Sequence, residues 1–328
     1  MKTGSVQGFG PVRRLVCVSV NSAIDKTAAV ERLVPGEIHR PELLSVVPGG
    51  KPLNVARSAR ALGLDASAIV VLGGHAGDWI EEQLAARGIR TRAVRVSGET
   101  RTCLSILDRE RGGLTEFYET GLELGPDGWA AVEEALRLEL ASDPSGTLVA
   151  ITGSLPPGAP LDGYCRLARM VRERGARAAV DVGGAHLVAA LAAEPWLAKV
   201  NAREAAEACG LTEGEVAAAS GVVAARELRR RGATTALVTL GVAGAGLVDD
   251  VGREWLIGAA PERGRYPVGS GDALLAGFAA ALARGASVAE AARHGAAVAC
   301  ANALRPGQAE FDPSDVGRLL PAITLRAL

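Results

Sequence analysis

The chain has 328 residues, of which 48% are hydrophobic but only 3% are aromatic, and its formal net charge is −1. This length allows one large or two modest domains, and the core must be built mainly from Ala, Val and Leu. A net charge near zero gives no general attraction to nucleic acid or to a membrane surface, so neither is an expected partner.

Short apolar runs alternate with amphipathic segments along most of the chain. The runs that predict strands are Leu15–Val20, Ala68–Leu72, Thr147–Thr152, Ala178–Val182, Ala198–Asn201 and Ala236–Leu240. The segments that predict helices are Leu53–Leu62, Trp79–Arg87, Trp129–Leu140, Gly163–Arg174, Ala218–Arg231 and Asp272–Arg284. This alternation is typical of a mostly parallel sheet with helices on both faces. We therefore expect one three-layer α/β/α domain over residues 1–328, with ligands at the carboxyl ends of its strands.

Two segments depart from this alternation, at about residues 27–47 and 91–119. Both read as short strands of alternating polarity, with turns at Pro35-Gly36 and Gly112-Gly113. We expect them to pair into one small antiparallel β-sheet outside the main domain. Such an appendage can close over a site as a lid and exclude water. The alternative is an extension of the sheet edge that does not move.

Cysteine usage and the length of the apolar segments indicate the compartment. No two of the five cysteines form a Cys-x-x-Cys pair, which favours neither a zinc site nor a disulfide framework. The apolar run after Arg13 and Arg14 is too short for a signal peptide, and Ala273–Ala283 is too short to span a bilayer. We therefore predict a cytoplasmic protein with no membrane partner.

Polar residues follow two of the predicted strands. Asp25 lies just beyond the first strand, where a carboxylate can accept hydrogen bonds from substrate hydroxyls or, alternatively, cap a turn. Asn201 and Glu204 follow another strand at a spacing that can orient water bound to Mg²⁺, an ion that takes few protein ligands. The same spacing resembles a helix capping box, and the two roles are compatible.

The segment Pro48–Asn54 is the first of three glycine-rich elements. Gly49 and Gly50 allow a close backbone approach, Lys51 offers a positive charge, and Asn54 offers an amide at the start of a helix. The segment is not a Walker A loop, because the G-x-x-x-x-G-K-[ST] spacing fails and Pro52 replaces the Mg²⁺-binding hydroxyl. Taken alone, it could be only a strand-to-helix turn.

The second glycine-rich element runs from Thr239 through Gly241 and Gly244 to Gly246. It is not G-x-G-x-x-G and leads toward a short strand rather than a helix. Both points disfavour a nicotinamide-dependent oxidoreductase. A glycine turn of this kind can still bring backbone amides close to a nucleotide phosphate.

The third element, Val268-Gly269-Ser270-Gly271-Asp272, stands where a turn passes into a helix. Glycines let backbone N–H groups converge on a ligand, and a helix N-terminus adds unpaired donors and a partial positive charge. Together they suit a phosphate or a phosphoryl group in transfer. Because Asp272 would repel a phosphate, its position indicates a proton acceptor for a substrate hydroxyl that attacks the phosphate.

In their order along the chain, these motifs resemble those of the PfkB carbohydrate kinases, which have the ribokinase-like fold. The order is N-S-A-I-D, G-G-K-P-L-N-V-A-R, G-S-L-P-P-G, N-A-R-E, V-T-L-G-V-A-G-A and V-G-S-G-D-A-L-L-A-G-F. Within the family, N-S-A-I-D and G-S-L-P-P-G are most similar to the 1-phosphofructokinase and tagatose-6-phosphate kinase branch. The resemblance covers about Val18 to Gln308. Each motif alone is weak, but six in the family's order are specific.

The resemblance implies Mg²⁺- and ATP-dependent phosphorylation of a sugar phosphate. It makes Asp272 the catalytic base and places an anion hole at the amides of Gly269, Ser270 and Gly271. The substrate-binding residues that it implies are Asp25, Gly49, Gly50, Lys51, Asn54 and Arg101. Of these, Arg101 and Lys51 would hold the phosphate of the acceptor. The nucleotide-binding residues that it implies are Asn201, Glu204, Thr239, Gly241, Gly244 and Asn302, and Asn201 and Glu204 would also bind Mg²⁺ through water.

The chain departs from the family's pattern at four places. Ser22 replaces Pro, Pro52 replaces Gly, and Val200 replaces the Pro of K-P-N. At the fourth place, the catalytic loop, Ser270 replaces Ala and Pro267 replaces a small polar residue. None of these changes removes a charged catalytic group. Pro52 lies in the substrate turn, so it affects the identity of the acceptor more than catalysis.

The leading hypothesis is transfer of a phosphoryl group from MgATP to the C1 hydroxyl of a ketohexose phosphate. Fructose 6-phosphate is the first acceptor to consider, with tagatose 6-phosphate as a related one. Fructose 1-phosphate is also a candidate, but its C1 oxygen already carries a phosphate, so it would accept the phosphoryl group at another hydroxyl. The alternatives are a kinase of an unphosphorylated sugar or nucleoside, and a non-catalytic protein that binds a sugar phosphate or nucleotide. If Val30, Leu33, Leu104 and Ile106 point outward from the small sheet, its apolar face predicts a homodimer through the lid.

Overall fold

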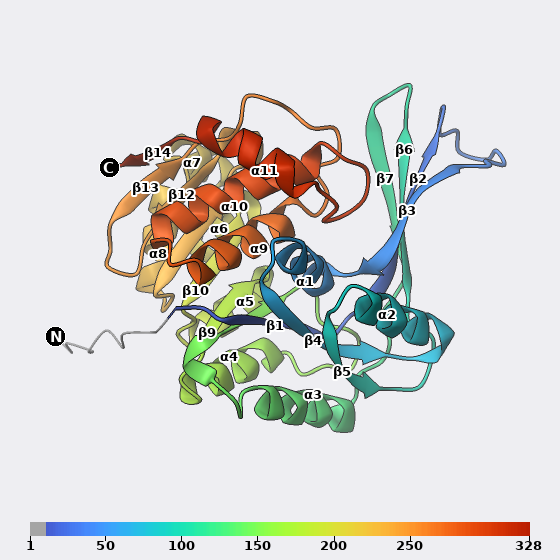
Figure 1. The fold of residues 1–328 in the computed structure, drawn as a ribbon, viewed down its shortest axis with the longest axis horizontal. Coiled ribbons are helices and arrows are strands. Elements are labelled where there is room, and N and C mark those ends of the chain that lie inside the picture. The colour runs from blue at the N-terminus through green and yellow to red at the C-terminus, as the bar shows by residue number, and fades with distance from the viewer. Residues whose placement is uncertain (1–10) are drawn as a thin grey trace.

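A computed structural model describes residues 11–328, whose strands form one large and one small sheet (Figure 1). The strands of the large sheet, in the order in which they lie side by side, are β14 (Leu325–Ala327), β13 (Glu254–Ile257), β12 (Ala245–Val248), β11 (Thr235–Thr239), β10 (Leu197–Asn201), β9 (Arg177–Asp181), β8 (Thr147–Thr152), β1 (Arg14–Ser19), β4 (Asp65–Leu72) and β5 (Arg90–Arg95). Neighbours from β11 to β5 run parallel, whereas β12, β13 and β14 extend one edge in antiparallel pairs. All six strands predicted from the sequence lie in the parallel part, which confirms the predicted mostly parallel sheet.

Helices cover both faces of the large sheet. They are α1 (Lys51–Ala61), α2 (Gly74–Ala86), α3 (Pro126–Glu139), α4 (Gly163–Glu173), α5 (Gly184–Leu191), α6 (Ala202–Cys209), α7 (Glu213–Ala218), α8 (Val222–Arg230), α9 (Ser270–Ala283), α10 (Val288–Ala303) and α11 (Pro313–Leu319), with 3-10 turns η1 (Pro144–Gly146), η2 (Gly241–Ala243) and η3 (Leu320–Ala322). The prediction of one helix over Ala218–Arg231 was wrong at its start. Ser220 and Gly221 adopt positive φ angles of 49° and 78°, which no helix accommodates, so α8 begins only at Val222.

The core has two layers, one on each face of the large sheet. Leu15 and Cys17 of β1 pack with side chains of α1, α9 and α10, while Val16 and Val18 pack with side chains of α3, α4 and α8. Successive residues of one strand therefore serve opposite layers, as the period of two in a β-strand requires. No helix within residues 11–328 combines the length and the hydrophobicity that a bilayer crossing requires.

The small sheet contains β3 (Glu42–Gly49), β2 (Ala23–Val30), β6 (Thr102–Asp108) and β7 (Gly113–Tyr118), in that order, and rises from one end of the molecule (Figure 1). The hairpins β2–β3 and β6–β7 are antiparallel, but the central pair β2–β6 is parallel. The prediction of an entirely antiparallel small sheet was therefore wrong. The two hairpins come together through a long crossover, and a crossover is the connection that a parallel pair needs.

The predicted bounds of the two excursions also need correction. The first is wider than residues 27–47, because β2 begins at Ala23 and β3 ends at Gly49. The second begins later than residue 91, because β5 (Arg90–Arg95) pairs with β4 at the edge of the large sheet. The polar alternation of β5 arises because an edge strand keeps one face near solvent. Residues 1–10 of the predicted domain lie outside the described residues.

Candidate active site

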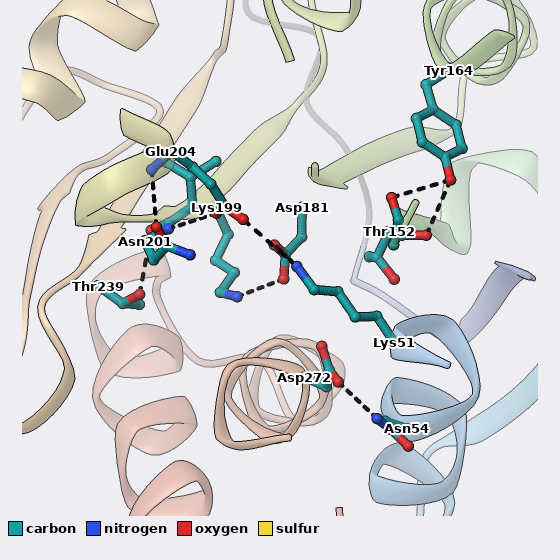
Figure 2. Close-up of polar contacts among 12 residues, drawn as sticks. Lys51, Asn54, Thr152, Tyr164, Asp181, Lys199, Asn201, Glu204, Thr239 and Asp272 are labelled. Atoms are coloured by element: carbon teal, nitrogen blue, oxygen red, sulfur yellow. Dashed lines mark hydrogen bonds and ion pairs between the residues drawn. The ribbon is translucent and has the colours of Figure 1, made fainter. Parts of the chain in front are cut away.

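The carboxyl ends of the parallel strands gather most of the predicted site residues, as expected for an α/β sheet. Side chains from the ends of β9, β10 and β11 face those at the starts of α1, α6 and α9 (Figure 2). Two carboxylates, Asp181 and Asp272, lie at the centre of this group. Asp272 was predicted from the sequence, whereas Asp181 was not.

Asp272 lies in the first turn of α9 and is buried, with 5% of its surface exposed. The side-chain amide of Asn54, from α1, donates a hydrogen bond of 2.9 Å to its Oδ2 atom. After Asp272, every residue of α9 from Ala273 to Leu282 is buried, so the helix is packed against neighbouring structure on all sides. The carboxylate therefore has a fixed position.

The environment of Asp272 raises its pKa. Burial is the main cause, because it penalises the charged carboxylate, and the negative charge of Asp181 adds to it; together they raise the pKa of Asp272 to about 6. Lys51, Lys199 and the hydrogen bond from Asn54 oppose the shift. A carboxylate with a pKa near 6 is a better proton acceptor at neutral pH than an ordinary aspartate, yet is still mostly ionised there.

Asp181 ends β9 and joins two ammonium groups. Lys199 of β10 donates a hydrogen bond of 2.5 Å to Oδ2, and Lys51 of α1 lies 3.4 Å from Oδ1 (Figure 2). Both Asp181 and Lys199 are buried, and the two lysines, with Lys199 the larger influence, hold the pKa of Asp181 below its usual range despite burial. Asp181 could have been predicted from the sequence, because, like Asp25, it is an acidic residue near the end of a predicted apolar strand.

The first turn of α9 offers backbone donors beside Asp272. The Ser270 amide is already bonded to the Pro267 carbonyl, but among residues 11–328 no backbone acceptor pairs with the amides of Gly271 and Asp272. A Cβ atom at Gly271 would stand 2.8 Å from the Lys199 ammonium, which therefore lies against this turn. An ammonium group and two open amides at a helix N-terminus suit an anion.

Asp25 of β2 lies under the Gly49-Gly50 turn. Its carboxylate is 3% exposed and accepts a hydrogen bond of 3.3 Å from the Gly50 amide. Burial raises the pKa of Asp25, partly opposed by that hydrogen bond and by the charges of Arg57 and Arg101. The backbone of Gly49 approaches so closely that a Cβ atom there would overlap the carboxylate.

We expect Gly49→Ala to fold but to lose at least about tenfold in kcat/KM for the acceptor, because the added methyl group must displace Asp25. Displacements of about 1 Å at such positions can cost 10²-fold. Steady-state kinetics and circular dichroism measure the two effects. Gly113→Ala is the matched control on the same sheet, because a Cβ atom there meets no atom within 4 Å. Wild-type kinetics in Gly49→Ala would remove the assigned role of Asp25.

Arg101 lies at the base of the small sheet, near Asp25. Its guanidinium donates to the carbonyls of Asn21 and Glu119, at 3.1 and 3.3 Å, while its buried Nε has no acceptor within residues 11–328. A buried donor without a partner is uncommon and fits a site for an anion. Lys51 does not lie beside it. The carboxylates of Asp181 and Glu204 hold the Lys51 ammonium, at 3.4 and 3.8 Å, so its contact with an acceptor phosphate stays a prediction.

Asn201 and Glu204 form the predicted capping box at the start of α6. The Asn201 Oδ1 atom accepts from the Glu204 amide at 2.9 Å, and the Glu204 Oε2 atom accepts from the Asn201 amide at 3.0 Å. No group of three or more His, Cys, Asp or Glu side chains within residues 11–328 could hold a metal ion. Two carboxylate groups remain as candidates for binding a metal ion. They are Glu204, through its Oε1 atom, and Asp181, and both contact the Lys51 ammonium. Two carboxylates fit Mg²⁺, which usually keeps its waters and binds phosphate oxygens.

The remaining nucleotide-binding predictions lie at the end of β11 and in α10. Thr239 donates through Oγ1 to the Val200 carbonyl at 3.3 Å, and Gly241 has open space where a Cβ atom would stand. At Gly244 a Cβ atom would collide with the Ile257 carbonyl, so this glycine is needed by the fold itself. Asn302 is fully buried and donates at 3.0 Å to the Val268 carbonyl and to Ser270 Oγ. It therefore supports the turn at Gly269 and Ser270, and its role in nucleotide binding stays a prediction.

The structure explains three of the departures locally. Ser270 supplies the hydroxyl that accepts from Asn302, Ser22 pairs its hydroxyl with that of Ser19 at 2.9 Å, and Pro52 occupies the first turn of α1. Proline is well tolerated at that position, because the first amides of a helix have no intrahelical acceptor. The change at Val200 has no such side-chain partner to explain it.

A separate cavity of about 1020 Å³ lies at the opposite, amino ends of the strands, among Arg253, Trp196 and Trp255. Arg253 is already paired with Asp249 at 3.1 Å and lies over Trp255. We therefore place the site at the carboxyl ends, where the buried carboxylates and open amides converge.

Comparison with known proteins identifies the family of the chain. A family model described as pfkB family carbohydrate kinase matches residues 13–315. A 1-phosphofructokinase of Xanthomonas campestris pv. campestris is 36% identical over 81% of this chain and 83% of its own length. A 1-phosphofructokinase of Haloferax volcanii is 38% identical over 86% of this chain and 88% of its own length. The phosphofructokinase-2 from Escherichia coli in complex with substrates and products has a TM-score of 0.84 at 28% identity, over 94% of this chain and 99% of that chain.

Proposed function

The chain belongs to the pfkB family of carbohydrate kinases, and we propose that it transfers the γ-phosphoryl group of ATP to a hydroxyl of a ketohexose phosphate, with Asp272 as the base. The observation that carries the proposal is the buried Asp272 carboxylate, held by Asn54 and set beside the open amides of α9. We further propose that residues 11–328 form one kinase domain, whose small sheet acts as its lid.

In this mechanism, Asp272 accepts the proton of the attacking hydroxyl. The bond from Asn54 to Oδ2 leaves Oδ1 for that hydroxyl. As the proton moves to the carboxylate, the hydroxyl oxygen forms its bond to the γ-phosphorus and the bond to the leaving ADP oxygen breaks. A positioned base typically contributes about 10²–10⁴-fold to the rate.

The amides of Gly271 and Asp272 and the Lys199 ammonium stabilise the charge on the transferred group. Loss of one donor of this kind costs on the order of 3 kcal/mol in comparable sites. Asp181 and Glu204 would hold Mg²⁺ through water, and the ion would neutralise phosphate charge when bound. The turn at Thr239 and Gly241 gives backbone access to the nucleotide phosphates. Positioning of the two substrates supplies much of the remaining acceleration.

The acceptor site combines a carboxylate for hydroxyls with a guanidinium for a phosphate. Asp25 and Asn54 face the acceptor from one side. Arg101, whose Nε atom has no acceptor within residues 11–328, lies close enough for its charge to lower the pKa of Asp25. A guanidinium recognises a phosphate through paired hydrogen bonds. The motifs favour fructose 6-phosphate. Two relatives are named 1-phosphofructokinase, which supports testing fructose 1-phosphate beside it.

A coupled assay of ADP release tests the proposal, with MgATP and a panel of fructose 6-phosphate, fructose 1-phosphate, tagatose 6-phosphate, fructose and adenosine. We expect turnover only with the phosphorylated ketohexoses. A preference for fructose or adenosine would instead support the alternative of an unphosphorylated acceptor. Tight binding without turnover of any acceptor would support a non-catalytic binding protein. A cytoplasmic location and the absence of nucleic-acid and membrane partners stay predictions.

We also propose a homodimer through the outer face of the small sheet. The register of the strands places Val30, Leu104 and Ile106 on one face, as predicted, but Val30 and Ile106 are only 8% and 9% exposed. The exposed apolar residues of that face are Phe117, opposite Leu104, and Leu43, opposite Ala28, at 55% and 60% exposure. Burial of such a patch would favour association.

Phe117→Glu should therefore shift the protein from dimer to monomer, because two charges would then meet in the interface. Light scattering at the assay concentration measures the mass. Val188→Glu on α5 is the matched control, since Val188 is also an exposed apolar residue, at 48%. A wild-type monomer would contradict the proposed dimer.

A further inference from the structure

Arg57 lies on α1, one turn beyond Asn54, and its guanidinium is buried behind the active site. The residue is 5% exposed and forms four hydrogen bonds. Its acceptors are the Pro48 carbonyl at 3.0 Å, Asn54 Oδ1 at 2.8 Å, the Gln308 carbonyl at 2.7 Å and Glu310 Oε1 at 2.6 Å. Two segments that are distant in the sequence, 48–57 and 308–310, therefore meet at one side chain.

These acceptors belong to three parts of the site: the end of β3, the start of α1 and the 308–310 segment. Pro48 precedes the glycine turn that covers Asp25, and Asn54 holds Asp272. Asn54 also donates at 3.2 Å to Gln308 Oε1, so its amide is fixed on both sides. Gln308 and Ala309 in turn lie against Gly269, where a Cβ atom would stand 2.8 Å from the Ala309 amide nitrogen.

The backbone conformation of Ala309 is one that an alanine does not favour intrinsically, so other contacts must stabilise it. Ala309 has a φ of 55°, in the left-handed region that non-glycine residues rarely adopt. Residues held in this way persist where surrounding contacts fix them. Here those contacts are the bonds from Arg57 to the residues on either side, Gln308 and Glu310.

We propose that Arg57 is the positioning residue of this active site, which fixes Asn54 and the 308–310 segment so that Asp272 and the Gly269 turn stand in their reactive arrangement. The inference rests on the proposed function, in which Asp272 is the base. A guanidinium suits the task because its planar fork carries five donors, whereas a lysine ammonium is a point charge on a flexible stem. A buried ion pair is weak support for stability, which leaves geometry as its main use here.

The structure also offers a way to test geometry separately from stability. A cavity of about 550 Å³ is lined by Arg57 together with Arg60, Arg87, Glu310 and Phe311. If the side chain of Arg57 is removed, a free guanidinium ion can enter from this cavity and meet the same acceptors.

The experiment compares Arg57→Ala, Arg57→Lys and Arg60→Ala with the full-length wild type. We expect both Arg57 variants to lower kcat by about 10²-fold with little change in the KM for ATP, because the base is displaced while the nucleotide contacts remain. Guanidinium chloride at millimolar concentration should partly restore kcat in Arg57→Ala, and sodium chloride should not. Arg60→Ala removes a guanidinium from the same helix and cavity but no hydrogen bond of the site, and should behave as wild type.

Hydrogen exchange provides a readout that does not depend on activity. The amides of residues 308–310 should exchange faster in Arg57→Ala than in wild type or Arg60→Ala. Arg57→Lys keeps the buried charge, so it tests the geometry even if Arg57→Ala does not fold. Wild-type kcat in a folded Arg57 variant, or unchanged exchange at residues 308–310, overturns the proposal. If the wild type phosphorylates no acceptor, the proposed function fails, while the exchange measurement still decides the role of Arg57.

Discussion

Asp272→Asn should lower kcat by about 10²–10⁴-fold while leaving the KM for ATP nearly unchanged. The substitution removes the proton acceptor but little else, because the new carboxamide oxygen can still accept the hydrogen bond from Asn54. The open amides of the first turn of α9 also remain. Steady-state kinetics with the preferred acceptor and binding of ATP by calorimetry measure the two effects. Full turnover in this variant would remove Asp272 from the mechanism.

The same substitution should stabilise the fold above pH 6. The pKa of Asp272 rises from an ordinary value of 3.8 to about 6 on folding, so the folded state binds a proton that the unfolded state has released. The carboxylate therefore destabilises the native protein increasingly as pH rises from about 4 to about 6, and fully above that range. A shift of about two units corresponds to roughly 3 kcal/mol. Urea unfolding should show Asp272→Asn more stable at pH 7, with the difference shrinking toward pH 4.

The pH dependence of the wild type gives an independent check. Because Asp272 must be ionised to accept a proton, kcat/KM should fall on the acid side with an apparent pKa near 6. Glu123→Gln is a control for the loss of an exposed carboxylate and should retain both the rate and the acid limb. If kcat/KM instead fell with an apparent pKa near 4, the pKa of Asp272 would not be raised in the free enzyme.

Arg101→Ala should lower kcat/KM for a phosphorylated acceptor by about 10- to 150-fold, mostly through KM. This range corresponds to the roughly 1.5–3 kcal/mol of a hydrogen bond to a charged group. The structural reason is the buried Nε of Arg101, which has no acceptor within residues 11–328 and lies near Asp25. Arg101→Lys should be intermediate, since an ammonium keeps the charge but not the paired donors. Substrate titrations at saturating MgATP measure the change.

The control for Arg101 is Arg111→Ala, which removes an arginine from the same small sheet that is exposed and paired with Asp108 at 4.0 Å. This control should leave KM unchanged. If Arg101→Ala binds the phosphorylated acceptor as well as wild type, the enzyme recognises the sugar rather than its phosphate. Comparison with an unphosphorylated sugar then separates the two kinds of acceptor.

The large sheet could be predicted from the sequence because buried parallel strands read as uninterrupted apolar runs. Thr147–Thr152 was placed at the correct bounds for this reason. The edge strands could not be placed in the same way. Arg90–Arg95 alternates in polarity because it has one neighbour, and that pattern is shared by strands of a half-exposed small sheet. The pairing of β2 with β6 joins residues that are 78 positions apart, from Ile24–Thr102 to Val30–Asp108, and local periodicity carries no information about contacts at that distance.

In the candidate site, residues that stand in glycine-rich turns could be predicted from the sequence. Some charged residues that are buried and paired with other polar side chains were not predicted. Asp272 and Gly49 were marked by their neighbours. Asp181, Lys199 and Arg57 lie within or beside apolar stretches, where a charged residue reads as an isolated exception. Only the fold shows that the two lysines share one carboxylate and that Arg57 joins residues 48–57 to residues 308–310.

The parallel pairing of β2 with β6 also sets an order for events on the ribosome. The hairpin of β2 and β3 is synthesised early. Its neighbour in the folded sheet, β6, is synthesised only after α1, β4, α2 and β5. Contacts of large sequence separation form slowly, and an isolated two-stranded hairpin is marginally stable in water. The first hairpin therefore lacks its partner strand until the ribosome has synthesised β6, and the edge of β2 stays unpaired during that interval. Slow codons before Thr102 should lengthen that interval, and aggregation of the nascent chain should increase with it.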